Sequence, residues 1–157
     1  MKILAVEFSS THRSVAVLEG ATVLGTAMET HGHRGIGLVE QALKLAHSAR
    51  EEIGVIAVGL GPGSYNGIRG AIALAQGWQL GRGINLLGIS SVDCVASSSH
   101  AAGLRGPVNI IIDAQRNEFY LARCEITANA WREIEPLRLA THSEIELIVK
   151  SQLSVID

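Results

Sequence analysis

Charge, cysteine and aromatic side chains are all scarce in this sequence of 157 residues. Charged residues make up 18% of it, and 13 basic residues against 15 acidic ones leave a formal net charge of -2. A protein that binds nucleic acid unaided needs a basic stripe to neutralise phosphates, so this balance disfavours direct contact with nucleic acid. The two cysteines, Cys94 and Cys124, are too isolated for a disulfide framework, and we expect both to act as small apolar fillers.

Long apolar runs are missing as well. None approaches the ~20 residues that a helix needs to cross a bilayer. Residues 1–7 read as a strand and reach an acid at Glu7, which argues against a signal peptide. We therefore expect a cytoplasmic protein with no membrane segment. The apolar share of 47% predicts either a well-filled core or an apolar surface that awaits a partner.

The short apolar runs that are present predict strands and helices in a similar order in the two halves of the sequence. Runs bounded by turn formers predict strands, and apolar residues at helical spacing predict helices. The first half has predicted strands Lys2–Phe8, Arg13–Leu18, Ala21–Met28, Ile53–Leu60 and Ile84–Ile89, and helices Ile36–Arg50, Ile68–Gly81 and Val92–His100. The second half has predicted strands Pro107–Asp113, Glu118–Ile126 and Trp131–Leu139, a short helix with a capping box of Thr141 and Glu144, and a strand Leu153–Ile156.

This order predicts an α/β protein with the actin-like, ribonuclease-H-related fold. In that fold three antiparallel strands are extended by parallel strands and crossover helices. Two βββαβ runs indicate a duplicated lobe. We expect a first lobe over residues 1–103 and a second over residues 104–157, which is incomplete because it ends without the last helix of its twin.

The most informative segment is the turn between a buried strand and a helix in residues 55–70. The predicted structural loop consists of Gly59, Gly61, Pro62, Gly63 and Ser64. Its glycines permit positive φ and its proline stiffens the turn, while Ser64 or Asn66 is placed to cap the helix. Free amides at such a turn also suit a phosphate, although neither the P-loop nor the G-x-G-x-x-G spacing is present. A structural turn and a phosphate cradle both stay open at this point.

The residue sequence of this turn is more specific for a protein family than the chemistry of its side chains is. Residues 59–69, Gly-Leu-Gly-Pro-Gly-Ser-Tyr-Asn-Gly-Ile-Arg, resemble the G-x-G-P-G-S-[FY]-T-G-x-R signature of the TsaB (YeaZ) family. Four further segments resemble that family in its own order, namely residues 3–17, 31–40, 87–93 and 112–120. The sequence departs from the pattern where Glu7 replaces an aspartate, and a family-typical C-terminal tail is missing.

The resemblance implies a non-catalytic partner of a TsaD-type enzyme, which transfers a threonylcarbamoyl group to adenosine 37 of tRNAs. It implies no catalytic residue, no metal and no cofactor in this chain, and contact with tRNA only through the complex. A TsaE-type ATPase is a further partner that the resemblance admits. Two copies are expected to pair when the enzyme is absent, because an isologous patch is self-complementary.

In that family the first two helices of the first lobe pack on the matching helices of the enzyme. Carried over by position, the expected partner-binding residues are His31, Leu38, Ala42, Ala46, Arg69, Ala71, Ala75 and Trp78. The second helix also carries a glycine stripe at Gly67, Gly70, Gly77 and Gly81. We expect this stripe to pack closely on the protein's own sheet, because each glycine otherwise costs a helix up to ~1 kcal/mol. The opposite face of the helix would then be exposed.

The sequence also holds a degenerate version of the phosphate site of ATP-using proteins of this fold. Its candidates are Glu7, Ser9, Ser10 and Thr11 in the first hairpin, and Asp113 in the second. Kinases and ATPases of this architecture carry glycine in both hairpin turns. Neither turn has one here, so side chains obstruct a close approach to phosphates. A polar turn that caps its own backbone is the alternative interpretation.

Other functions stay open. The fold also suits a small-molecule kinase or ATPase, and a divergent interaction module without a role in tRNA modification is the second alternative. The third is a peptidase that uses Ser64 and His31, although no acid–base partner for Ser64 is recognisable. His31 and His33 together supply too few ligands for a metal site.

Overall fold

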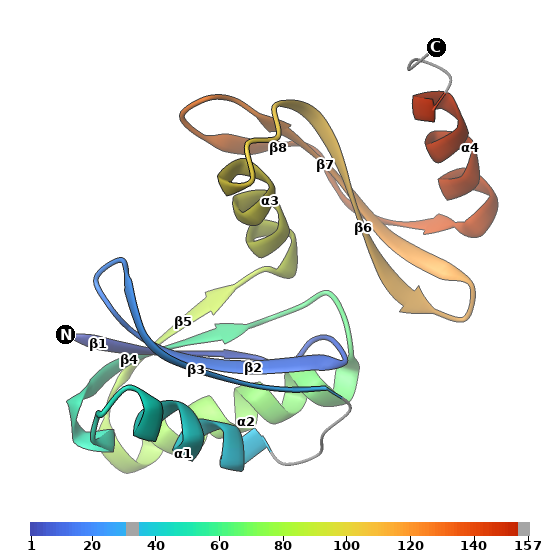
Figure 1. The fold of residues 1–157 in the computed structure, drawn as a ribbon. Coiled ribbons are helices and arrows are strands. Elements are labelled where there is room, and N and C mark those ends of the chain that lie inside the picture. Colours follow the sequence, from blue (N-terminus) through green and yellow to red (C-terminus); the bar gives the residue numbers. More distant parts are fainter. Residues whose placement is uncertain (31–34, 154–157) are drawn as a thin grey trace. The chain divides into compact units, whose positions relative to one another are not determined.

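The structure is a computed structural model that describes residues 1–30 and 35–153. The chain divides into two compact units, Met1–Ser91 and Val92–Asp157. In Figure 1 the first unit is coloured from blue to yellow-green and the second from yellow to red. Helix α3 (Ser91–Ala101) packs with the second unit, and the lobe boundary that we expect after residue 103 stays a prediction.

The first unit contains a five-stranded sheet with the order β3-β2-β1-β4-β5. Its strands are β1 (Lys2–Glu7), β2 (His12–Glu19), β3 (Thr22–Thr30), β4 (Ile53–Gly59) and β5 (Asn85–Ile89). The first three strands pair antiparallel, and β4 and β5 extend the sheet in parallel from β1. This is the arrangement that the order of elements predicts for an actin-like lobe.

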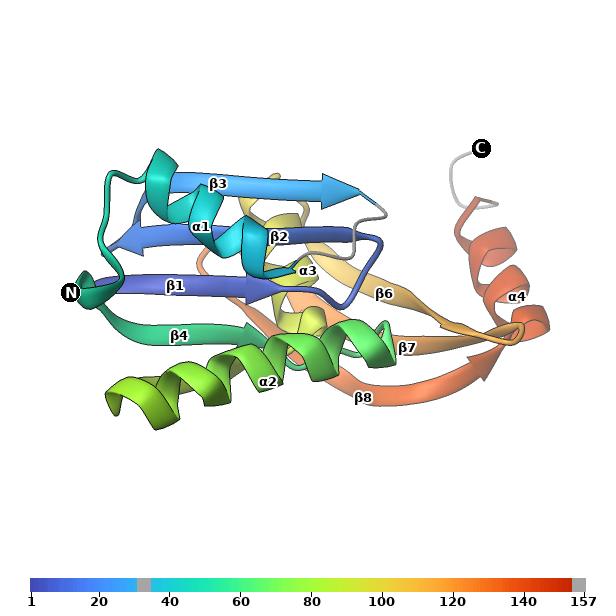
Figure 2. The ribbon, with the colours of Figure 1, turned by 90° about the horizontal axis from the view of Figure 1, so that it is seen from below.

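Two helices, α1 (Gly35–Leu45) and α2 (Tyr65–Arg82), cover one face of this sheet (Figure 2). α1 lies on β2 and β3, whereas α2 lies on β1, β4 and β5. Leu4, Val15 and Ile56 point from the strands to this face and are fully buried at 0% exposure. Burial of such a side chain stabilises the fold by about 1.5–3 kcal/mol. This core fixes the two helices side by side on the sheet.

Helix α1 ends at Leu45, earlier than the predicted end at Arg50. A Schellman-type cap stops it, because the Ser48 amide donates to the Leu43 carbonyl at 3.0 Å and the His47 amide to the Lys44 carbonyl at 3.1 Å. His47 takes the left-handed position of this cap, with φ of 47°. The 3-10 turn η1 (Arg50–Glu52) then leads into β4. Apolar spacing does not report such local hydrogen bonds, which is why it predicted too long a helix.

The second unit is a three-stranded antiparallel sheet with the order β6-β7-β8. Its strands are β6 (Gly106–Gln115), β7 (Glu118–Ile126) and β8 (Trp131–Thr141), and α4 (His142–Leu153) follows them. Ala96 of α3 packs with Ala122 of β7, whereas Ile145 of α4 packs with the neighbouring Leu121. Neighbouring strand residues point to opposite faces, so α3 and α4 cover opposite sides of this sheet.

The C-terminal strand Leu153–Ile156 is wrong at its first residue, because Leu153 belongs to α4. Residues 154–156 lie outside the described residues.

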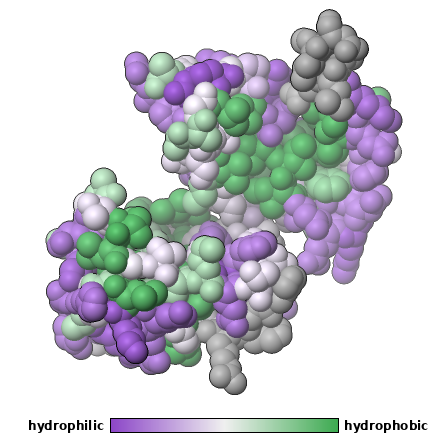
Figure 3. Space-filling view, viewed as in Figure 1, coloured by the Kyte–Doolittle hydropathy of each residue, from purple (hydrophilic) through white to green (hydrophobic). Residues whose placement is uncertain are grey.

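Figure 3 shows apolar side chains, in green, gathered over the sheet of the second unit. Exposed apolar residues of β8 include Leu137 at 40% and Leu139 at 55%. The apolar share of the sequence therefore supplies both a filled core and apolar surface.

The two cysteines have different environments. Cys124 of β7 is fully buried at 0% exposure, and burial raises the pKa of its thiol above the ordinary value. Cys94 of α3 is exposed. The expectation of a buried apolar filler is therefore confirmed for Cys124 and wrong for Cys94.

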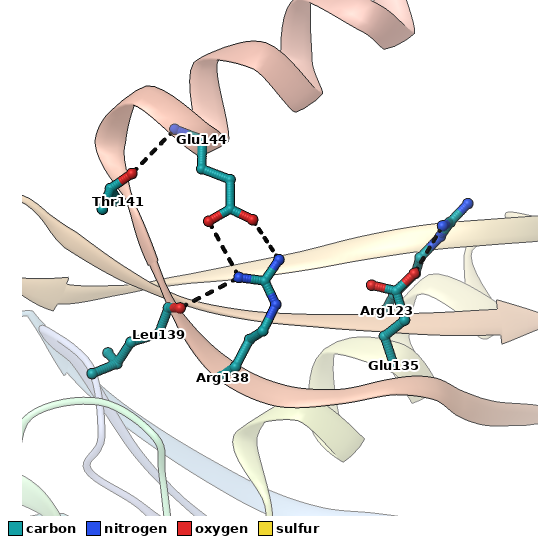
Figure 4. Close-up of polar contacts among 6 residues, drawn as sticks. All are labelled: Arg123, Glu135, Arg138, Leu139, Thr141 and Glu144. Carbon is teal, nitrogen blue, oxygen red and sulfur yellow. Dashed lines mark hydrogen bonds and ion pairs between the residues drawn. The ribbon is translucent and has the colours of Figure 1, made fainter.

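Helix α4 begins with one half of the predicted capping box (Figure 4). The Glu144 amide donates to Thr141 Oγ1 at 3.3 Å. The Glu144 carboxylate does not return to Thr141 but accepts from both terminal nitrogens of Arg138, one of them at 3.2 Å. Charge-assisted bonds of this kind are stronger than a bond to a neutral amide. They hold the pKa of Glu144 below its ordinary value and raise the pKa of Arg138.

Replacing Arg138 by methionine should raise the pKa of Glu144 toward its ordinary value of 4.5, as measured by NMR titration of the carboxyl carbon. A lowered folded-state pKa stabilises the folded state above the unfolded pKa, and this contribution is lost as pH falls through the folded pKa. The wild type should therefore have a higher free energy of unfolding than Arg138→Met above pH 4.5, and this difference should shrink as pH falls below 4.5. Arg123→Met breaks the neighbouring 3.0 Å ion pair with Glu135 and should leave Glu144 unchanged. An unshifted Glu144 in Arg138→Met would contradict the assignment.

Replacing His47 by glycine should raise the free energy of unfolding by about 0.5–1 kcal/mol, because glycine adopts the left-handed conformation without a Cβ clash. Chemical denaturation measures the change. His47→Ala is the matched control, since alanine keeps the Cβ and should bring no such gain. A less stable glycine variant would show that the cap depends on the histidine side chain.

Candidate docking face and phosphate-site remnant

The turn Gly59–Ser64 joins β4 to α2 and is tied to the first hairpin. The Ser64 amide donates to the Ser9 carbonyl at 2.6 Å. Ser64 also caps α2, because its Oγ accepts from the Gly67 amide at 3.3 Å. Of the two residues placed to cap the helix, Ser64 is therefore the one used. Its hydroxyl serves here as a structural acceptor.

The end of β1 lies so close to this turn that two glycines are required. A Cβ on Gly59 would overlap the Glu7 carboxylate, and a Cβ on Gly67 would overlap the Phe8 carbonyl oxygen. Glycine allows the close approach of the Phe8 backbone at Gly67 and of the Glu7 side chain at Gly59. The contact favours a structural role for the glycine loop, and it aligns the first turn of α2 with the end of β1.

Each acid of the two hairpins accepts a hydrogen bond from its own turn. Glu7 Oε1 accepts from the Ser9 amide at 2.5 Å in the first unit, and Asp113 Oδ1 accepts from the Gln115 amide at 2.7 Å in the second. Backbone amides at a turn are the groups that cradle a phosphate in ATP-using folds. Here a carboxylate already uses one of them in each hairpin and adds a negative charge that repels an anion.

The other candidates of the first hairpin also bond locally. Ser9 Oγ lies 3.1 Å from Ser91 Oγ, and Ser10 Oγ accepts from the His12 amide at 3.1 Å. Thr11 is exposed, with its hydroxyl 3.4 Å from His12 Nδ1. The second hairpin turn has left-handed backbone at residues 115–117, with φ between 55° and 66°, although none of them is glycine. Side chains therefore cover both turns.

Metal and membrane features are absent from the described part of the chain. Among residues 1–30 and 35–153, no three His, Cys, Asp or Glu side chains gather as metal ligands would. His31 and His33 lie outside these residues. No helix within the same residues has both the length and the hydropathy to span a bilayer.

The structure reverses the face of α2 that we expected to be exposed. Four of the predicted partner-binding side chains are 0–4% exposed and belong to the unit's own core: Leu38, Ala42, Ala71 and Ala75. Ala46 and Trp78 are partly buried against this core, and Arg69 is exposed. His31 lies outside the described residues. Fully buried side chains present no surface to a partner, so the expected contact set needs correction.

Most of the glycine stripe faces outward instead. A Cβ added to Gly70, Gly77 or Gly81 would meet nothing within 4 Å, and Gly67 alone of the stripe packs inward. The physical reason is that burial favours apolar carbon, which the alanine side of the helix has and the glycine side lacks. Binding of a partner stays a prediction, and the side of α2 that is open to a partner is the one that carries Gly70 and Gly77.

A groove of about 560 Å³ lies between α1 and α2. Its lining is mainly apolar and includes Phe8, Ile36, Val39, Leu74 and Trp78, with Arg13 and Arg50 also contributing. Ile36, at the rim of the groove, is 70% exposed. An apolar groove between two helices is the form of site that accepts an amphipathic helix.

A second hollow of about 490 Å³ lies on the other side of α2 and includes Arg69 and Gln76. Asn66, Gly70 and Ala73 line both hollows. The nearly bare backbone of α2 thus forms a ridge between them. We call the ridge with its two hollows the α1–α2 face.

Sequence reasoning missed the outer residues of this face, above all Arg13, Ile36 and Ala73. One signal was present. The polar residues Asn66, Arg69 and Gln76 recur at spacings of three and seven, on the same side of the helix as Gly70 and Gly77. Polar residues at helical spacing mark the solvent side.

Comparison with known proteins assigns the chain to a family. The sequence model of the family described as "TsaD: tRNA N6-adenosine threonylcarbamoyltransferase" matches residues 9–146. The chain is 30% identical over 132 residues to the tRNA threonylcarbamoyladenosine biosynthesis protein TsaB of Escherichia coli K12. It is also 30% identical over 125 residues to the TsaB protein of Bacillus subtilis 168. The chain belongs to the TsaB (YeaZ) family.

The solved structures agree. YeaZ from Pseudomonas aeruginosa matches this TsaB-family chain with a TM-score of 0.79 at 26% identity, over 89% of this chain and 67% of that one. Component A of (R)-2-hydroxyglutaryl-CoA dehydratase from Acidaminococcus fermentans matches with a TM-score of 0.51 at 15% identity, over 86% of this chain and 48% of that one. The second likeness concerns the fold alone. The predicted actin-like α/β fold is confirmed.

The TsaB-family chain spans little more than half the length of the curated relatives that it matches. The match covers 82% of this chain and 57% of the Escherichia coli protein, and 76% of this chain and 53% of the Bacillus subtilis protein.

Arginine substitutions on the two sides of α2 should differ in their effect on the free energy of unfolding. Ala75→Arg places a charge in the core and should lower the free energy of unfolding by about 3 kcal/mol or more, or prevent folding. Ala73→Arg, two residues away on the exposed side, should change it by no more than about 0.5 kcal/mol. Circular dichroism with thermal melting measures both. A folded, wild-type-like Ala75→Arg beside an unfolded Ala73→Arg would reverse the assignment of faces.

Proposed function

We propose that this chain is a non-catalytic subunit in the cytoplasmic synthesis of threonylcarbamoyladenosine at position 37 of tRNA. In this proposal the chain holds a TsaD-type enzyme through the α1–α2 face, and it meets tRNA only through that enzyme. The names of its curated relatives, tRNA threonylcarbamoyladenosine biosynthesis proteins, support the pathway.

The α1–α2 face is the observation that carries the proposal. It combines an apolar groove with an exposed isoleucine at its rim and a ridge of glycine and alanine beside it. An added Cβ at Gly70 or Gly77 meets only open space, so a partner's backbone can come close to α2. Close backbone approach offsets the helix-destabilising effect of these glycines, which gives them a reason to be there.

The hairpin geometry supports the absence of catalysis by this chain alone. Glu7 and Asp113 each accept a backbone amide of their own turn, at 2.5 Å and 2.7 Å. At either hairpin, a nucleotide phosphate would have to displace the bond and approach the carboxylate of that hairpin, both of which are unfavourable. The role of the chain is then to bind and orient, and the chemistry belongs to its partner.

A second candidate function is the transferase reaction itself. It is favoured by the description of the matching family, which names a threonylcarbamoyltransferase. The two candidates differ in one measurable respect, because a transferase forms threonylcarbamoyladenosine without a second protein of the TsaD type. A homodimer through the α1–α2 face and a TsaE-type ATPase in the complex stay predictions.

Binding to the TsaD-type protein of the same organism tests the proposal. Isothermal titration calorimetry should detect a one-to-one complex with the wild type. Ala73→Arg should weaken the complex about tenfold or more, because a long charged side chain then stands on the ridge. Ala101→Arg, an exposed alanine on α3, is the matched control and should bind as the wild type does.

Reconstituted tRNA modification separates the two candidate functions. The chain alone should form no threonylcarbamoyladenosine, and adding the TsaD-type enzyme should restore formation with the wild type but less with Ala73→Arg. Product formed by the isolated chain would favour the transferase. Equal binding of Ala73→Arg and the wild type would refute docking through the α1–α2 face.

A further inference from the structure

The charged side chains that line the two hollows of the α1–α2 face are arginines. Arg13 and Arg50 line the groove, and Arg69 lines the hollow on the other side of α2. Among the described residues, no aspartate or glutamate lines either hollow. Helix α2 itself contains two arginines, Arg69 and Arg82, and no acid from Tyr65 to Arg82. An apolar site is thus bordered by positive charge on both sides.

Two of these arginines, Arg13 and Arg69, lie over aromatic rings. The Arg13 guanidinium lies over the Phe8 ring, 5.7 Å from its centroid, and the Arg69 guanidinium lies 5.3 Å from the centroid of the Tyr65 ring. Within residues 1–30 and 35–153 neither has an ion pair. Stacking uses the flat face of a guanidinium and leaves the N–H groups at its edge free to bind a carboxylate in a bidentate manner. The stack also orders the side chain before any partner arrives.

We propose, on the basis of the docking function above, that the α1–α2 face selects a helical protein surface that carries carboxylates on both sides of its apolar contact line. One carboxylate meets Arg13 at the groove, and another meets Arg69 beyond the ridge. The ridge of Gly70 and Ala73 lets the partner helix approach closely enough for both contacts. The apolar groove supplies affinity, and the two arginines supply orientation and a faster association.

A second copy of this chain is a poorer occupant of the same face. In an isologous pair the face meets itself, so the arginines of one copy approach those of the other. Glu40 is the acid that α1 and α2 offer within the described residues, and it already pairs with Arg50 at 2.9 Å. The charge pattern therefore favours a different, acidic partner over self-association.

The association of the purified chain with its TsaD-type protein tests this inference when followed by biolayer interferometry at low and high salt. The association rate should fall by about tenfold between roughly 50 and 500 mM NaCl, because salt screens the steering charges. Arg69→Glu and Arg13→Glu should each lower the affinity at low salt by about tenfold or more. At high salt the difference in affinity between each variant and the wild type should be smaller. Arg132→Glu, the same change at an exposed site of β8, should change neither the association rate nor the affinity. Circular dichroism verifies that each variant is folded.

The outcomes are separable. If the wild type binds with a rate that is insensitive to salt, and both reversal variants bind as tightly as Arg132→Glu, the charge inference is overturned while the docking function stands. If the wild type does not bind at any salt concentration, the docking function fails and this inference fails with it. A homodimer that is tighter than the complex with the TsaD-type protein, and that is lost in Ala73→Arg, would identify a second copy as the occupant of the α1–α2 face. That result would also overturn the charge inference.

Discussion

The end of β1 lies directly against the turn that starts α2, and much of the first unit depends on this contact. Gly59 gives space to the Glu7 carboxylate, Gly67 gives space to the Phe8 carbonyl, and the Ser64 amide bonds to Ser9 at 2.6 Å. No side chain larger than hydrogen fits at either glycine without moving backbone or carboxylate. The contact sets where α2 begins, and the core beneath the helix then sets which side of it faces outward.

The first unit contains both the first hairpin with its acid and the exposed side of α2. One turn amide in each hairpin donates to the acid of that hairpin, so the protein's own carboxylate already uses this amide. In the first unit, α2 presents a ridge of glycine and alanine between two hollows. The proposed docking function therefore needs no change in the strand order of this fold.

Much of the fold could be predicted from the sequence, because strand order and strand pairing follow from local patterns. The alternation of apolar residues and the turn formers between them located every strand of both sheets to within a few residues. Helix boundaries were less predictable. The end of α1 depends on a pair of hydrogen bonds around His47. Helix α4 begins directly after its predicted cap Thr141, but its Glu144 carboxylate binds Arg138 and does not close the capping box. Neither arrangement has a signature in apolar spacing.

The sequence by itself determined the family, the order of the strands and the need for glycine in the turn after β4, because each of these rests on local motifs or local backbone geometry. Only the tertiary structure decided which side of α2 is surface. The glycine stripe and the alanine side are both compatible with close packing when the helix is considered alone. The sheet distinguishes them, because covering Ala71 and Ala75 removes apolar carbon from water, whereas covering Gly70 and Gly77 would remove almost none.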